Sequence, residues 1–200
     1  MLHDVAAVLV VRAALRRQEE HVLILVRHAH AGDKRLWPFS DLERPLSEQG
    51  LEQAIGLEQV LGGFPVTRLL TSPARRCRQS LGPLAERLGL MVEEREELAR
   101  DVSPEVLDEF LARPAVQGAV CCTHGETLSA LLRRWRRHKS VLLPKEPTTT
   151  PKGASWVIED GGAGRAAHYL PPLRVLAGSP APQPAYQLEE EPAPRQAAVG

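Results

Sequence analysis

The stretch His21-Val22-Leu23-Ile24-Leu25-Val26-Arg27-His28 decides how this chain of 200 residues folds. Its apolar run has the length of a strand and is too short for a buried helix. Apolar and polar residues do not alternate in it, as they would in a strand with one face exposed to solvent. Such continuous runs are typical of parallel strands that are covered on both sides. The sequence therefore predicts a central parallel strand with Arg27 and His28 at its carboxyl end.

Two later segments repeat this order of an apolar strand followed by polar residues. Residues 66–71 predict a second strand, and Ser72-Pro73 then predicts a helix with Ser72 as N-cap, which puts Arg76 in its first turn. Residues 116–123 predict a third strand, which ends at His124. Open α/β sheets bind ligands outside the carboxyl ends of their strands, so we expect these polar groups to converge in one crevice.

Helical segments alternate with these strands. Helices are predicted over residues 46–61, with Ser47 as N-cap and glycines ending the run, and over 127–137, and a β-hairpin is predicted over 156–170. The alternation predicts an α/β fold with three layers, α/β/α, and a mostly parallel central sheet. We assign this domain to residues 1–172, with an extra strand or turn over 1–20, and expect a disordered Pro/Ala-rich tail over 173–200.

Composition narrows the classes of partner. The 25 Lys and Arg residues balance 25 Asp and Glu residues, so no overall charge favours nucleic acid or a membrane surface, and we expect neither as a partner. The first apolar run, residues 5–11, is too short for a signal peptide or a membrane span. Three cysteines, two of them adjacent, make no disulfide framework and predict a cytoplasmic protein with small buried thiols. Because the net charge is zero, any anion-binding site must come from a local cluster of basic residues.

The polar groups at the three strand ends suit a phosphoryl group. Arginine forks bind its oxygens in pairs, and a neutral imidazole nitrogen can attack phosphorus. The alternative is a metal site built from His28, His30 and the cysteines, but the ligand spacing of zinc sites is missing from these segments. We therefore expect no metal.

Four ordered motifs resemble the histidine phosphatase superfamily. Leu25-Val26-Arg27-His28-Ala29 is similar to its Arg-His-Gly signature, with Ala29 in place of Gly. Residues 71–80 resemble the segment whose arginine, here Arg76, binds phosphate, and residues 122–126 resemble the second-histidine motif, which assigns His124. Residues 41–50, followed by Ala54, resemble the start of the family's first helix. The resemblance covers about residues 21–172.

Residues 152–157 and 167–171 narrow the resemblance to small bacterial members such as phosphohistidine phosphatases, and to modules joined to Nudix hydrolases. No Nudix signature is present in this sequence, so we expect the phosphatase module alone. The resemblance implies a phosphoglycerate mutase-like fold and a two-step reaction without cofactors. His28 takes the phosphoryl group, and water then releases phosphate. Arg27, Arg76 and His124 hold the oxygens, and the other nitrogen of His28 donates to a backbone carbonyl.

The resemblance leaves the proton donor open. Relatives place a carboxylic acid before the third strand, where Glu96, Glu97 and Asp101 lie, and Asp33 and Glu126 are further options. Glu97 and Glu126 are our candidates. A missing acid would itself point to a leaving group that departs easily, such as the imidazole of phosphohistidine.

Two basic segments are candidates for contacts with the rest of the substrate. Lys34, Arg35 and Trp37 follow the signature, and we predict that they bind substrate, with Trp37 stacking on a base. Residues 133–139 form a second basic cluster, which we interpret as a solvated helix face with Trp135 packed inward rather than as a substrate-recruiting rim.

The sequence thus predicts a phosphatase that acts through a phosphohistidine on a small phosphorylated metabolite or nucleotide. A protein phosphohistidine phosphatase is the second interpretation, with a phosphorylated protein as partner. A non-catalytic phosphate-binding regulatory module is the third, suggested by Ala29 and by the unassigned acid.

Overall fold

The computed structural model describes residues 22–161 and 164–173. The strand or turn predicted over 1–20 and the predicted tail, apart from Leu173, lie outside the described residues. The strands are β1 (Leu23–Arg27), β2 (Arg68–Thr71), β3 (Val92–Glu94), β4 (Ala119–Thr123), β5 (Ser155–Gly161) and β6 (Gly164–Leu170). The helices are α2 (Glu48–Leu61), α3 (Arg75–Leu88), α4 (Pro104–Leu111) and α5 (Gly125–His138), with 3-10 turns η1 (Lys34–Leu36), η2 (Glu96–Leu98) and η3 (Pro114–Val116).

The six strands form one sheet in the order β3-β2-β4-β1-β5-β6. The pairs β3–β2, β2–β4 and β4–β1 are parallel, and the hairpin β5–β6 joins β1 in antiparallel fashion. This arrangement confirms the mostly parallel sheet and the closing hairpin. It places β1 inside the sheet, between β4 and β5, as its continuous apolar run predicted.

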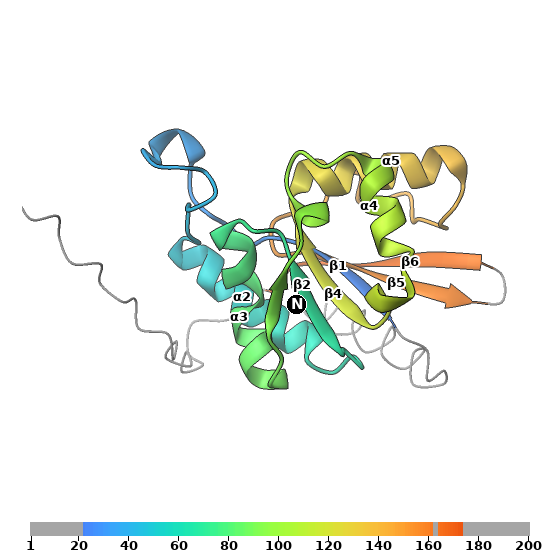
Figure 1. Cartoon of the computed structure of the whole chain (residues 1–200), viewed down its shortest axis with the longest axis horizontal. Helices are drawn as coiled ribbons and strands as arrows, with labels where there is room; N and C mark the ends of the chain where they lie inside the picture. The colour runs from blue at the N-terminus through green and yellow to red at the C-terminus, as the bar shows by residue number, and fades with distance from the viewer. Residues whose placement is uncertain (1–21, 162–163, 174–200) are drawn as a thin grey trace, which may run out of the picture.

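Helices cover both faces of the sheet, which confirms the three layers (Figure 1). Along β1, Leu23 and Leu25 belong to the core cluster that includes residues of α4 and α5. Ile24 and Val26 belong to the opposite cluster, which includes residues of α2 and α3. All four side chains are at most 1% exposed. Because side chains alternate between the two faces of a strand, the apolar run of β1 contributes to the core on each side of the sheet.

The predicted helix over 46–61 is α2, and its N-cap is Ser47, whose Oγ accepts from the Gly50 amide at 3.2 Å. The predicted cap of the next helix is wrong. Helix α3 begins at Arg75 with Ala74 as N-cap, because the hydroxyl of Ser72 lies 2.8 Å from the His124 imidazole and has only a long contact, 3.4 Å, with the Ala74 amide. The short strand β3 and helix α4 were not predicted, since neither has a long periodic pattern.

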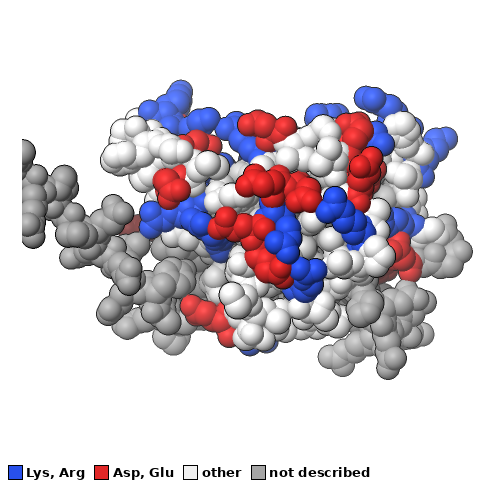
Figure 2. All heavy atoms as spheres, viewed as in Figure 1, with Lys and Arg blue, Asp and Glu red and all other residues white. Residues whose placement is uncertain are grey.

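Surface charges pair rather than segregate on the face seen in Figure 2, where basic and acidic side chains lie beside one another. Arg68 bonds Glu93 at 2.8 Å, and Arg78 bonds Glu94 at 2.6 Å. In α5, Trp135 is buried, as predicted, and donates to Asp108 at 2.7 Å, while Arg134 pairs with the same carboxylate at 3.1 Å. In the described ranges no helix is long and apolar enough to cross a bilayer.

Candidate active site

The ends of the three neighbouring parallel strands are in register, so their polar residues meet. The His28 amide donates to the Thr123 carbonyl at 3.0 Å, and the Ser72 amide donates to the Cys122 carbonyl at 3.0 Å. These bonds extend the ladders β1–β4 and β2–β4 by one residue. His28, Ser72 and His124 therefore follow adjacent strands at one edge of the sheet.

His28 is held in a neutral form by its backbone partner and its surroundings. Its Nδ1 donates to its neighbour's carbonyl, the Ala29 oxygen, at 2.7 Å, which is the hydrogen bond expected from the sequence. Burial lowers the pKa of His28 to about 3, and the nearby His124, Arg76 and Arg27 act in the same direction, although the Ala29 bond opposes them. The Nε2 lone pair is consequently free of a proton at neutral pH.

His124 is fixed on both sides of its ring. Its Nε2 lies 2.8 Å from the Ser72 hydroxyl, and its Nδ1 lies 3.3 Å from Nη2 of Arg76. The rings of His28 and His124 are 5.3 Å apart, centre to centre, in an edge-on arrangement. An arginine nitrogen only donates, so Nδ1 accepts here and Nε2 carries the hydrogen toward the Ser72 hydroxyl.

Arg27 is locked between a carbonyl and a glycine. Its Nη1 donates to the Thr150 oxygen at 2.7 Å, while its Nε is buried without a partner among the described residues. A Cβ placed on Gly125 would lie 2.5 Å from the guanidinium carbon of Arg27. The glycine that follows His124 is therefore needed for the close approach of this guanidinium.

Asp41 gathers the guanidinium groups around the site. Arg76 donates to its backbone oxygen at 2.5 Å and to Oδ2 at 3.2 Å, and Arg44 donates to Oδ1 at 2.9 Å. Arg100 and Lys34 lie 3.5 Å and 4.0 Å from Oδ2. This carboxylate, which the sequence reading did not assign to the site, is surrounded by four cationic side chains.

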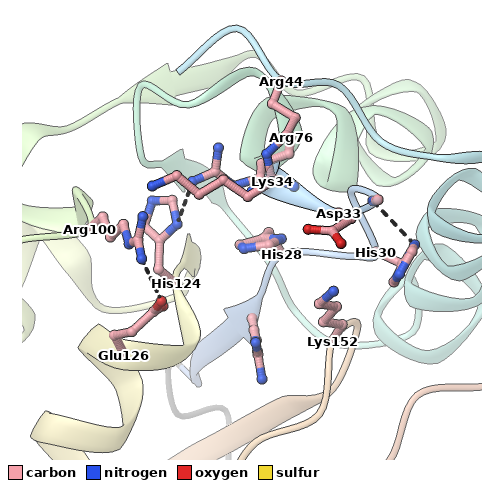
Figure 3. A pocket seen from close by; sticks show the side chains of 12 residues that line it. His28, His30, Asp33, Lys34, Arg44, Arg76, Arg100, His124, Glu126 and Lys152 are labelled. Carbon is pink, nitrogen blue, oxygen red and sulfur yellow. Dashed lines mark hydrogen bonds and ion pairs between the residues drawn. The ribbon is translucent and has the colours of Figure 1, made fainter. Parts of the chain in front are cut away.

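Together these groups form a cavity of about 460 Å³, which we call the strand-end pocket (Figure 3). Its lining comprises Arg27, His28, His30, Gly32, Asp33, Lys34, Arg44, Arg76, Arg100, His124, Glu126 and Lys152. Six arginine and lysine side chains line the pocket, against two carboxylates. A chain without net charge thus carries a local site for a multiply charged anion.

The structure brings most of the predicted site residues into this pocket and leaves three outside. Arg27, His28, Arg76 and His124 line it together with Lys34 and Glu126. Arg35 is exposed and pairs with Asp33 at 2.7 Å, and Trp37 lines a neighbouring hollow but not the strand-end pocket. Glu97, a candidate acid, pairs with Arg113 at 2.8 Å outside the pocket. These three therefore do not face the converged groups.

Sequence reasoning missed five residues at or beside the pocket. Arg44 lies within the motif that resembles the family's helix start, which was a usable signal. Arg100 follows η2, His30 and Lys152 stand in loops, and Asp41 precedes Arg44 by three positions. Asp41 and Lys152 lie within segments that resemble the family, but no local pattern assigned them a role at the site, because only the packing of the elements brings these loop residues to the sheet edge.

The carboxylates that line the pocket, and Asp41 beside it, are held ionised. Burial raises the pKa of Glu126, but a backbone hydrogen bond and the charge of Arg100 outweigh it, so the pKa lies below its usual range. The side-chain and backbone bonds of Arg35 lower the pKa of Asp33. For Asp41, burial is likewise outweighed by Arg44 and Arg76. None of these three is poised to donate a proton at neutral pH.

Ala29, which stands where the resemblance expects Gly, fits its place. Its side chain is fully buried beside Ala31, Leu46 and Ala54, and its amide donates to the Ser80 hydroxyl at 2.9 Å. Its backbone does not adopt the left-handed conformation that would demand glycine, since Lys139 is the one non-glycine residue with positive φ in the described ranges. The Ala29 substitution therefore leaves the signature loop unstrained.

Comparisons with known proteins agree with this geometry. The model of the histidine phosphatase superfamily, branch 1, matches residues 23–100. An 8-oxo-(d)GTP phosphatase of Mycolicibacterium smegmatis is 30% identical over 170 residues, which cover 80% of this chain and 52% of that protein. The chain thus spans about half the length of this curated relative.

Solved structures share the fold. The protein histidine phosphatase SixA complexed with tungstate superposes with a TM-score of 0.57 at 21% identity, covering 74% of this chain and 93% of that chain. A mycobacterial glucosyl-3-phosphoglycerate phosphatase complexed with VO3 superposes with a TM-score of 0.54 at 16% identity, covering 74% and 97%.

Proposed function

The chain belongs to the histidine phosphatase superfamily, and we propose that it is a phosphatase that hydrolyses a small phosphorylated metabolite or nucleotide through a phosphohistidine. The observation that carries the proposal is the neutral Nε2 of His28 in a pocket lined by Arg27, Arg76 and His124. An unprotonated nitrogen beside groups that bind phosphate oxygens is what in-line attack on phosphorus requires.

In the first step, Nε2 of His28 forms a bond to phosphorus while the bond to the leaving group breaks and its electron pair departs with that group. The proton on Nδ1 stays in place, and the Ala29 carbonyl stabilises the positive charge that develops on the ring. Arg27 and Arg76 offset the charge on the phosphoryl oxygens. Water then attacks phosphorus, its protons remain on the released phosphate or pass to solvent, and the electron pair of the broken N–P bond returns to Nε2.

The ionised carboxylates restrict the leaving group. Without a protonated acid, an alkoxide departs slowly, whereas a phosphate or an imidazole departs easily. The name of the M. smegmatis relative, an 8-oxo-(d)GTP phosphatase, supports a nucleotide as the substrate class. A phosphorylated histidine on a partner protein is the second candidate, because its imidazole leaving group also needs no strong acid.

We also propose that the protein is cytoplasmic. Cys77, Cys121 and Cys122 are buried as free thiols in the described structure, as small core residues would be. Free thiols are typical of a reducing compartment.

Hydrolysis of p-nitrophenyl phosphate in the presence of a chelator tests the proposal. We expect turnover by the wild-type protein and a loss of about 10³-fold or more for His28→Ala, because the nucleophile is removed. A radiolabelled phosphodonor should leave acid-labile, base-stable label on the wild type only.

Near-normal activity of His28→Ala would contradict the histidine mechanism. If no phosphorylated compound is hydrolysed while inorganic phosphate still binds, the protein is instead a phosphate-binding module.

A further inference from the structure

A second cavity of about 530 Å³ adjoins the strand-end pocket and shares His30 and Lys152 with it. Its other lining residues are Gln49, Glu52 and Gln53 of α2, Pro151, Pro172 and Leu173. We call it the α2 cavity. It combines amides and a carboxylate on one wall with prolines and a leucine on the others. Such a mixture suits a group that has both an apolar face and a hydrogen-bonding edge.

The segments that enclose the α2 cavity pack closely against one another. A Cβ on Gly56 would lie 2.6 Å from the Leu173 carbonyl oxygen, so residue 173 packs directly on α2. Gly153, with a φ of +75°, lies against Gln53, where an added Cβ would be 3.2 Å from the Gln53 Cβ. Three segments far apart in the sequence thus enclose one space.

Lys152 lies at the junction of the two cavities, on a loop whose neighbouring backbone is held by hydrogen bonds. On one side, the Thr150 carbonyl accepts from Arg27 at 2.7 Å. On the other, the Gly153 amide donates to the carbonyls of Arg27 at 3.1 Å and His28 at 3.3 Å. The loop that carries Lys152 is therefore tied to the strand end that carries the nucleophile, and Figure 3 shows the two side chains facing the same space.

The ammonium group of Lys152 lacks a counter-ion in the structure described. No described carboxylate lies within 4.0 Å of its Nζ, in contrast to Lys34, which reaches Asp41. Burial and the charges of Arg27 and Arg44 lower its pKa, although Asp33 opposes them. A partly buried cation without a partner is costly unless an anion joins it.

Gln53 also has unused hydrogen-bonding capacity. Its Oε1 accepts from the His30 amide at 2.8 Å. No residue in 22–161 or 164–173 accepts from its NH₂ group. Glu52 and Gln49 are exposed on the first turns of the same helix and add an acceptor and an amide to this wall.

From this juxtaposition we infer that the substrate is a nucleoside di- or triphosphate whose leaving phosphate binds Lys152 and whose nucleoside lies in the α2 cavity. The inference rests on the proposed function, since it assigns the leaving group of that reaction. The bridging P–O bond breaks as the His28–phosphorus bond forms, and the bridging oxygen keeps the electron pair. Lys152 stabilises the resulting phosphate anion by charge, so no protonated carboxylic acid is required.

The test compares GDP with p-nitrophenyl phosphate, which has neither a second phosphate nor a nucleoside. We expect Lys152→Met to lower kcat/KM for GDP about 100-fold but that for p-nitrophenyl phosphate only about threefold, the difference of one charge-assisted contact. Lys145→Met, which removes an exposed lysine outside both cavities, is the matched control and should change neither value.

The nucleoside wall is tested by Glu52→Gln, with Glu48→Gln as its control. Both glutamates are exposed on the first turns of α2, but only Glu52 lines the α2 cavity. We expect Glu52→Gln to raise KM for GDP about tenfold without changing that for p-nitrophenyl phosphate, whereas Glu48→Gln should leave both unchanged.

The outcomes separate this inference from the proposed function. Hydrolysis of p-nitrophenyl phosphate that depends on His28, with no turnover of GDP, overturns the inference alone. An equal loss on both substrates in Lys152→Met does the same. If nothing is hydrolysed, calorimetry of GDP with His28→Ala decides: unchanged affinity after adding Lys152→Met overturns the inference even though the proposed function has already failed.

Discussion

The strand-end pocket has two walls that differ in how firmly their side chains are held. On the strand-end wall, His28, Arg76 and His124 are at most 6% exposed, and each bonds a fixed neighbour. The loop wall is formed by the loop of residues 32–40, which contributes Gly32, Asp33 and Lys34 to the pocket. Farther along this loop, outside the pocket, Leu36 and Phe39 are 83% and 71% exposed. Figure 1 shows this loop extending away from the body of the domain. The contrast teaches that the groups for chemistry are buried and preorganised at strand ends, while the loop beside them leaves its apolar side chains exposed.

Replacing Arg76 should give the largest effect within this comparison. Arg76→Ala removes a guanidinium group that binds phosphoryl oxygens from the strand-end wall, and we expect kcat for p-nitrophenyl phosphate to fall about 10²- to 10³-fold. Arg75→Ala, one position earlier and outside the pocket, should stay within about twofold. Thermal unfolding of both variants controls for loss of structure, and Arg76→Lys should recover only part of the activity, because lysine keeps the charge without the fork. If Arg75→Ala lost more activity than Arg76→Ala, the arginine that contacts the substrate would be Arg75, and our assignment of Arg76 would be wrong.

Asp41 connects the two walls, and its neutralisation should give an intermediate effect. In Asp41→Asn, Arg76 and Arg44 lose an ionic partner but Arg76 keeps the backbone carbonyl, so we expect kcat to fall about tenfold. The pocket also loses a negative charge that competes with the substrate. Inorganic phosphate should therefore inhibit the variant at lower concentration than the wild type. A fall in kcat together with weaker phosphate inhibition would show that Asp41 supports the fold rather than tunes the pocket.

Removing Trp37, an aromatic side chain of the same loop that lies outside the pocket, should have the smallest effect. Trp37 donates to the Ser40 carbonyl at 2.9 Å and packs edge-on against Phe39, outside the strand-end pocket. We expect Trp37→Ala to change kcat/KM less than about twofold for p-nitrophenyl phosphate and for GDP. A loss of more than tenfold with GDP alone would mean that the loop closes over the nucleotide, as the base-stacking expectation from the sequence requires.

Local sequence patterns predicted the elements that carry the chemistry. Residues 23–27 form a strand covered on both faces, and a continuous apolar run of that length leaves few other conformations with a buried backbone that is fully hydrogen-bonded. The start of α3 was misplaced by two residues, because Ser72 has a stronger partner in His124 than in the helix. That partner is 52 positions away, beyond the reach of any local rule.

The sequence by itself determined the three-layer sheet and the positions of Arg27, His28 and His124 at strand ends, since hydrophobic periodicity fixes where a strand stops. Arg76, in the first turn of α3, was assigned by the resemblance of residues 71–80 to the family motif. Only the tertiary structure decided which loop residues join them. Asp41 pairs with Arg100, and Lys152 lines both cavities. These contacts form because α2 and the hairpin β5–β6 pack against β1, the strand that precedes the nucleophile His28. Loop positions depend on the sum of many distant contacts, and no short stretch of sequence encodes that sum.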